Sequence, residues 1–472
     1  MNDHARRPTA AAFLIAALAA ALGAAGPGAA ASTGVPPPPV PPPAAPAPAT
    51  PPAPSGAVTL SLDDAIARAL QASHRIGEAL ARQEAADAAV AARKAANMPT
   101  ISLAAGYLRT NHVDEFGIPA MGAAPARIIY PDVPDNWRSR LDVQWPIYTF
   151  GRVEAAERAA RAEAAASGRD TAATRADVRL DAARAFWAYA TAIESVRVVE
   201  EALALVDAHL RDVRNMRAVG LLAPNDVLSA EARRSRQEVQ LIEARTIRDV
   251  AEADLRRVTG IPPDVSIAVD AALEAAPAPI PSGEALLAEA QAKRPERQAL
   301  ESRAAAVGER QAAAAAGRRP SVALTAGVDY ARPNARIFPR AAAWNDSWDL
   351  GVSVAWPLWD GGRAKAEIAE AAASRRALAE RLAEFDAALG FEVRQRRLDL
   401  ESARASIRAA TDEVASAAEA RRVVAERFKA GLVTSTEVLD AQQELLAAQF
   451  DRTRALAAAR LAAARLDRAV GR

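Results

Sequence analysis

Cysteine is absent from the 472 residues of this chain, and only four residues are histidine. The absence of cysteine excludes disulfides, thiol nucleophiles, cysteine metal sites and a lipid attached to a cysteine behind a signal sequence. The histidines are scattered, and the sequence contains no H-E-x-x-H, no G-x-S-x-G and no phosphate-binding glycine loop. We therefore expect no catalytic, cofactor-binding or metal-binding residues, and a protein that is not an enzyme.

An excess of charge and long apolar runs are also lacking. The net charge is +1 with both signs interspersed, which gives no reason to expect nucleic acid as a partner. One apolar run, residues 11–25, follows Arg6 and Arg7 and precedes small residues at 29–31. It is shorter than a membrane span of about 20 residues. We interpret residues 1–31 as a signal peptide, with an uncleaved anchor as the alternative.

The remaining chain divides into a linker and two copies of one pattern. Residues 32–58 are almost only Pro and Ala, which predicts an extended linker without a core. The first structural repeat covers residues 59–260, an Ala/Pro-rich equatorial linker covers 261–282, and the second repeat covers 283–472.

Each repeat contains two segments in which apolar residues alternate with polar or small ones, the period of a strand. These strands are expected at about residues 99–109 and 136–148, and at about 320–331 and 346–359. Tryptophans bound the apolar faces of the second strand in each repeat: Trp137, Trp145, Trp348 and Trp356. Such a stripe, about 26 Å long, is typical of a strand that crosses an outer membrane with its aromatic residues at the two interfaces. A soluble sheet with one buried face is the alternative.

Two long helices and two tight turns follow the strands. From Arg152 to Gly220, and from Arg363 to Gly431, 68 residues pass without a proline, which predicts a continuous helix about 100 Å long in each repeat. The turns recur with an offset of 211 residues, since Gly220-Leu221 becomes Gly431-Leu432 and both are followed by Val-Leu.

A returning helix is expected after each turn, from Asn225 to about Thr259 and from Thr434 to about Val470. Asn225 is the expected N-cap of the first helix. Thr434 and Glu437 have the spacing of a capping box at the start of the second.

Four membrane strands cannot close a barrel, because single-chain barrels need about eight and an open strand edge is excluded from lipid. The chain must therefore oligomerise. Three copies would supply twelve strands, and the same symmetry would arrange the helices as a tube.

The duplicated layout, the Trp-Pro strand exits with Gly-Arg and the two Gly-Leu turns resemble the TolC family of outer-membrane efflux and secretion channels, over about Thr59 to Arg472. The resemblance implies a mainly α fold with a small membrane β part, in which a helix-strand-strand-long helix-tip-helix unit is duplicated. It implies a homotrimer with a 12-stranded β-barrel in outer-membrane lipid and a long periplasmic α-helical barrel. The expected function is a passive conduit of a tripartite efflux or type I secretion system, fed by an inner-membrane pump and opened when a periplasmic adaptor protein docks.

The same resemblance assigns roles to residues at the two turns. The expected adaptor-docking tips comprise Gly220, Leu221, Leu222, Gly431, Leu432 and Thr434. Glu437 and Asp440, with Asp226, match the acidic positions of the constriction at the tunnel end. Acidic residues in the first turn of a helix are also favoured by the helix dipole and by capping. This is the alternative explanation for all three acidic residues, and it is sufficient to explain Asp226.

The sequence departs from the best-known member of the family at the tips. A tyrosine and an arginine that hold its closed tip together correspond here to Phe428 and Val433. We therefore expect other contacts to hold the tip closed. Ser73-His74 also replaces a polar-Pro pair that Arg294-Pro295 retains.

A periplasmic coiled-coil adaptor or structural protein of the same kind of system is the second function considered. An adaptor would carry one helical hairpin, whereas this chain is expected to carry two hairpins and two amphipathic strand pairs. The cargo and the class of pump are not encoded in any pattern of the sequence.

Overall fold

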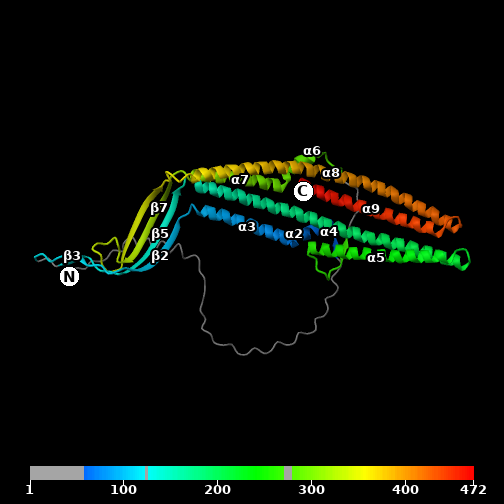
Figure 1. Cartoon of the computed structure of the whole chain (residues 1–472), viewed down its shortest axis with the longest axis horizontal. Helices are drawn as coiled ribbons and strands as arrows, with labels where there is room; N and C mark the ends of the chain where they lie inside the picture. The colour runs from blue at the N-terminus through cyan, green and yellow to red at the C-terminus, as the bar shows by residue number, and fades with distance from the viewer. Residues whose placement is uncertain (1–57, 123–125, 271–278) are drawn as a thin grey trace, which may run out of the picture. The chain divides into compact units, whose positions relative to one another are not determined.

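The computed structural model describes residues 58–122, 126–270 and 279–472 (Figure 1). All of them belong to one compact unit, Pro54–Arg472. The expected signal peptide and nearly the whole Pro/Ala-rich linker lie outside the described residues, as do residues 271–278 of the segment between the repeats.

The two repeats follow the same order of long elements. The first contains β1 (Val58–Leu60), α2 (Leu62–Ala72), α3 (His74–Ala95), β2 (Thr100–Arg109), β3 (Phe116–Ile118), β4 (Arg127–Tyr130), β5 (Asp135–Tyr148), α4 (Arg152–Ala218) and α5 (Pro224–Thr259). The second contains α6 (Gly283–Lys293), α7 (Pro295–Ala316), β7 (Ser321–Arg332), β8 (Asn345–Ala355), α8 (Arg363–Lys429) and α9 (Ser435–Val470), and the short strand β6 (Ile267–Val269) precedes it.

The long helices α4 and α8 are continuous over 67 residues each. At 1.5 Å per residue each extends about 100 Å, as predicted. Each begins after a glycine in the left-handed region, Gly151 with φ 84° and Gly362 with φ 87°. Side chains with a Cβ rarely adopt this conformation, so glycine allows the sharp change from strand to helix. One face of α4 packs on its neighbours through Val196, Val199, Val206, Leu210 and Val213, all buried.

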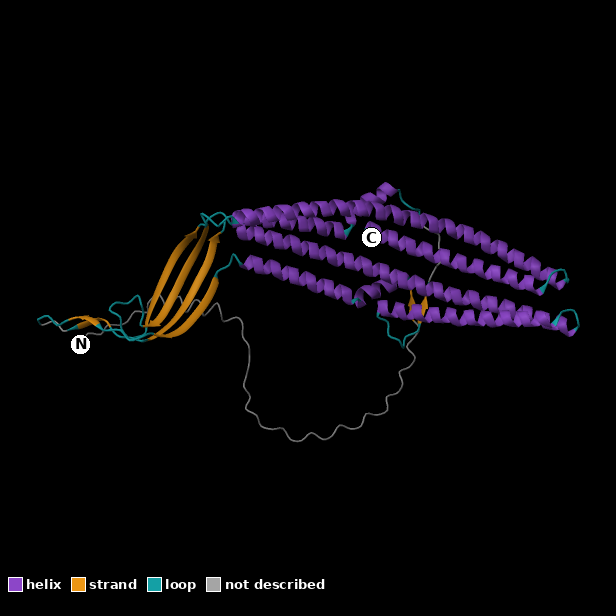
Figure 2. Ribbon diagram, viewed as in Figure 1, coloured by secondary structure: helices purple, strands orange, loops and turns teal. Residues whose placement is uncertain are grey.

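Figure 2 shows the four long strands side by side in one sheet. The sheet is antiparallel, and its strand order is β2-β5-β7-β8. The central pair, β5 and β7, joins the two repeats, with Leu141 opposite Val328 and Arg140 opposite Asp329. Among the described strands, none pairs with the outer side of β2 or of β8. The sheet of one chain is therefore open at both edges.

Two predicted bounds were wrong, both because of proline. The last strand ends at Ala355 instead of 359, and Pro357 soon after it has no N–H for a strand ladder. In β5 the equivalent Pro146 is accommodated by a shift of register before Tyr148. Asn225 is not the N-cap of α5, because Pro224 is the first helical residue and Ala223 occupies the cap. Proline at the first position is favoured, since its fixed φ suits a helix and it has no N–H to satisfy.

Two small sheets were not predicted. β1 pairs in parallel with β6, with Leu60 opposite Val269, and Leu60 is fully buried in the same cluster as Phe186 of α4. β3 and β4 form a hairpin in the loop that is longer in the first repeat. The short strands lack the long alternation on which strand prediction depends.

No helix in the described part of the chain is both long enough and apolar enough to span a membrane.

Candidate functional site

One face of the four-stranded sheet is apolar and uncovered. Leu103 on β2 is 70% exposed, and Leu350, Val352 and Val354 on β8 are 64%, 66% and 67% exposed. Because successive residues of a strand point to opposite faces, these side chains share the face with Leu141 and Val143 of β5. Contiguous exposed apolar surface of this kind marks a membrane or protein contact.

Tryptophans lie at both ends of this apolar face, as predicted from the sequence. At the helix-proximal end, Trp145 Nε1 donates to the Asn97 carbonyl at 3.1 Å, and Trp356 Nε1 donates to the Arg318 carbonyl at 3.2 Å. The same bond thus recurs in both repeats. A satisfied N–H with an exposed ring suits a membrane interface, where one end of the side chain is wet and the other apolar. At the far end Trp137 and Trp348 are 43% and 65% exposed.

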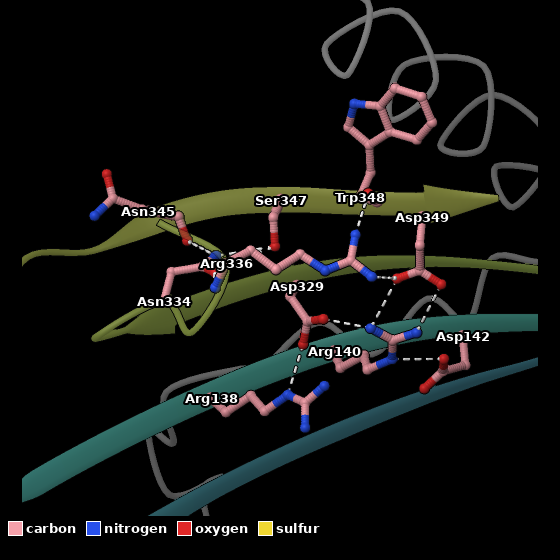
Figure 3. Close-up of polar contacts among 10 residues, drawn as sticks. All are labelled: Arg138, Arg140, Asp142, Asp329, Asn334, Arg336, Asn345, Ser347, Trp348 and Asp349. Carbon is pink, nitrogen blue, oxygen red and sulfur yellow. Dashed lines mark hydrogen bonds and ion pairs between the residues drawn. The ribbon is translucent and has the colours of Figure 1, made fainter. Parts of the chain in front are cut away.

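The opposite face of the sheet carries a network of arginines and aspartates (Figure 3). Arg140 on β5 pairs with Asp142 at 2.7 Å, with Asp349 at 3.0 Å and closely with Asp329. Arg138 pairs with Asp329 through Nε at 2.6 Å. Figure 3 shows the Trp348 ring on the far side of β8 from these charges. The sheet therefore has one face suited to lipid and one suited to water.

Small residues make room for the Arg140 guanidinium. A Cβ added to Gly327 would come within 2.3 Å of Arg140 Nη2. Ala104 lies opposite Arg140 on β2, and Gly106 lies opposite Arg138. The network joins residues about 190 positions apart. The alternation of the predicted strand places Arg138, Arg140 and Asp142 on one face, but no pattern in the sequence predicts their partners on β7 and β8.

At the other end of α4 and α8, each tip turn depends on a glycine in the left-handed region. Gly220 has φ 81° and Gly431 has φ 71°. The backbone N–H of the residue after each glycine donates a hydrogen bond back to the preceding helix. Leu221 N donates to the Met216 carbonyl, and Leu432 N donates to the Arg427 carbonyl, each at 2.9 Å. This closes the helix end and leaves the leucine side chains outside, 71% exposed at Leu221 and 73% at Leu432.

The two tips pack against each other around Phe428. This side chain of α8 is 4% exposed and lies in one cluster with Leu210 and Val213 of α4 and Val227 of α5. Val433 and Leu222 pack at the edge of the cluster. Leu222, expected at a docking surface, is partly buried and packs against this cluster. Phe428 and Val433, which cannot form the polar contact of the best-known family member, instead pack against apolar side chains.

A buried polar contact adds to this packing. His209 of α4 is 5% exposed, and its Nε2 lies 2.9 Å from the Ser435 hydroxyl at the start of α9. Its ring lies 5.0 Å from that of Phe428. We call His209, Phe428 and Ser435 the hairpin latch, because they join α4 to α8 and α9. Sequence reasoning did not predict this contact of His209, which lies one residue before the buried Leu210.

The acidic residues assigned to a constriction differ in their contacts. Glu437 caps α9, since its carboxylate accepts from Thr434 N and from Thr434 Oγ1, both at 3.1 Å. The predicted capping box is thereby confirmed. Asp226 caps α5 by accepting from Ala223 N at 3.2 Å. The side chain of Asp440 is 68% exposed, and its carboxylate lies 3.5 Å from Arg233 of the other hairpin.

Burial lowers the pKa of His209, although Asp212 and Ser435 act in the opposite direction. A group with a lowered folded pKa stabilises the packed tips above its unfolded pKa, about 6.5, and this stability is lost as the pH falls toward the folded pKa. We predict that the protection factors of the amide hydrogens at residues 205–230 and 424–440, which are corrected for the intrinsic pH dependence of exchange, fall below pH 6.5 by at most about tenfold per pH unit. His209→Asn should remove this dependence and His112→Asn should keep it. Equal protection factors at pH 8 and pH 5.5 in the unsubstituted protein would contradict the prediction.

Within the described residues, no group of three His, Asp or Glu side chains is arranged to hold a metal ion.

Comparison with known proteins agrees with this geometry. The family profile described as outer membrane efflux protein matches residues 65–261 and 286–472. The outer membrane efflux protein BepC of Brucella suis biovar 1 (strain 1330) is 31% identical over 255 residues, 53% of this chain and 54% of that protein. The chain thus aligns with about half the length of this curated relative.

Solved structures share the fold at lower identity. The outer membrane protein VceC of Vibrio cholerae has a TM-score of 0.70 at 23% identity, covering 87% of this chain and 96% of that one. The outer membrane channel CmeC of Campylobacter jejuni has a TM-score of 0.70 at 17% identity, covering 87% and 85%. The repeated helical hairpins, the open four-stranded sheet and the profile match over both repeats together show that the chain belongs to the outer membrane efflux protein family.

Proposed function

We propose that this protein is the outer-membrane channel of a tripartite efflux or type I secretion system. It is a passive conduit and not an enzyme, and it connects an inner-membrane pump to the exterior. The observation that carries the proposal is the sheet, whose exposed apolar face is bounded by tryptophans and whose opposite face is charged. A strand that separates lipid from a water-filled lumen requires this division.

The working unit in this proposal is a homotrimer. Four strands with two open edges need neighbours in a membrane, because unpaired strand edges are too costly in lipid. The helices, like the strands, have an outer group at each side of the chain. At one side α8 packs on α7 and α9, and at the other side α3 and α5 pack on α4. A head-to-tail contact of β8 and α8 with β2, α3 and α5 of the next copy closes the ring. Three copies give twelve strands, enough for a barrel with an open lumen.

The exposed apolar sheet also decides against the second candidate function. A periplasmic adaptor has no lipid to cover Leu350, Val352 and Val354, and it would leave this face in water. The relative BepC is named an outer membrane efflux protein, which supports the channel over the adaptor.

Docking of a periplasmic adaptor is assigned to the tips. Leu221 and Leu432 present exposed apolar side chains on turns that only glycine forms without strain. Their neighbour Thr434 is occupied in the cap of α9, so its role is to hold the turn in place.

The constriction of the conduit is assigned to Glu437 and Asp440. In a trimer two carboxylates from each copy surround the axis, an arrangement that favours cations in a pore. Arg233 moderates this charge, because its guanidinium lies near Asp440 and donates to Gln443 at 2.6 Å. Asp226 serves the α5 cap and adds to the negative charge at the tips.

The gate is tested by removing charge without removing bulk. In planar bilayers under a KCl gradient, Glu437→Gln with Asp440→Asn should lower the cation-to-anion permeability ratio and weaken block by divalent cations, because the carboxylates at the narrowest ring are lost. Asp87→Asn on α3 removes a comparable charge outside the constriction and should leave the ratio unchanged. A double variant with the selectivity and block of the unsubstituted channel would exclude these residues from the gate.

A further inference from the structure

The loop between β7 and β8, residues 333–344, folds back onto the charged face of the sheet. Arg336 Nη1 donates to the Trp348 carbonyl at 2.6 Å, and Arg336 Nη2 lies 3.1 Å from Asp349 Oδ1. Figure 3 shows Arg336 extended beside β8, on the side of the charged network and away from the Trp348 ring. The loop is thus attached to the face that is polar, not to the face that meets lipid.

Asn334 fixes the start of this loop. It is 3% exposed, and its Nδ2 donates to the Asn345 carbonyl and to the Ser347 hydroxyl, both at 3.0 Å. Its Oδ1 accepts from the backbone N–H of Arg336 at 2.9 Å. Because the nitrogen and the oxygen of this buried amide are both hydrogen-bonded, Asn334 fixes the backbone that carries Arg336. The position of this arginine is therefore built into the fold.

Arg336 also extends the network that spans the sheet. Asp349 is shared between Arg336 and Arg140, and Arg140 continues to Asp329 and Arg138. Three arginines, 138, 140 and 336, balance three aspartates, 142, 329 and 349. The network therefore holds the loop without giving the surface a net charge. Each arginine that meets a shared carboxylate loses freedom of movement.

The loop lies at the end of the sheet remote from the long helices, because β7 starts next to α7 and β8 ends shortly before α8. We propose that loop 333–344 forms a second constriction, at the outer mouth of the conduit, with Arg336 as the residue that holds it inward. This inference rests on the proposed function, since the charged face borders a lumen only if copies of the sheet close around it.

The absence of native cysteine allows a single reactive thiol to be placed in the loop. Arg336→Cys should release the loop, and single-channel conductance in planar bilayers should rise by roughly 1.5-fold or more as the mouth widens. A bulky methanethiosulfonate reagent added from the outer side should then lower the current again. Met121→Cys, at a 72% exposed position in the connection between β3 and β4, should react with the reagent without a change in current.

Asn334→Ala provides a second variant that breaks the same anchor without a thiol, and it should raise conductance in the same direction. If the unsubstituted protein forms no conducting trimer, the proposed function fails whatever the loop does. If it conducts, and if neither Arg336→Cys with its reagent nor Asn334→Ala changes the current, the second constriction is refuted while the channel stands.

Discussion

Replacing Phe428 with alanine should separate the two hairpin tips of each protomer and leave the channel open without an adaptor. Phe428 is 4% exposed and packs with Leu210, Val213 and Val438, which lie on both hairpins. Removing a buried phenylalanine costs about 3–5 kcal/mol. The two hairpins have no covalent link at this end, so we expect the loss to appear as separation of the tips and not as global unfolding.

The expected readout is a large rise in single-channel conductance of purified protein, together with faster proteolysis of residues 219–223 and 430–434. Phe116→Ala serves as the matched control, because Phe116 lies on the outer hairpin β3–β4 and is 67% exposed. It should leave both measurements unchanged. A Phe428→Ala channel as closed as the unsubstituted one would show that the latch does not hold the tips together.

The second large effect is expected in the membrane band. Leu350→Arg places a charge in the middle of the apolar face of β8, where the leucine is 64% exposed. A charge at the bilayer midplane of a barrel costs about 2–4 kcal/mol per site, and a symmetric trimer would bear it once per copy. We expect little or no trimer in the outer membrane, with the protein accumulating in the periplasm or being degraded.

Ser353→Arg introduces the same side chain on the same strand, three residues further on and therefore on the opposite face. This face already contains Asp349 and the network around Arg140, so an added arginine remains in water. The variant should assemble at a normal level, which fractionation of outer membranes measures. Equal assembly of both variants would contradict the assignment of the two faces.

The local patterns of the sequence were sufficient for most of the secondary structure. The long helices were predicted because 68 residues without proline separate Arg152 from Gly220, and the strands because a period of two is visible over a dozen residues. The cap at Thr434 and Glu437 was predicted for the same reason, since its partners are three residues apart. Local patterns were not sufficient for the end of the last strand, which was predicted at 359 and lies at Ala355. The same Trp-Pro pair continues a strand in the first repeat and follows the end of a strand in the second.

Contacts between distant segments could not be predicted. Arg140 and Asp329 are 189 residues apart, and His209 and Ser435 are 226 apart. No periodicity relates the two members of such a pair, so only the fold brings them together. The sequence showed that Phe428 and Val433 could not form the family's polar contact. The structure supplies what replaces it, a buried apolar cluster and a histidine.

Three copies of the chain should close around one water-filled lumen. The most direct test is native mass measurement of the full protein extracted from outer membranes in detergent, followed by planar bilayer recording of the same sample. We expect the trimer to require detergent for extraction, to have the mass of three chains until it is heated, and to open discrete channels in the bilayer. A water-soluble monomer without channel activity would contradict it.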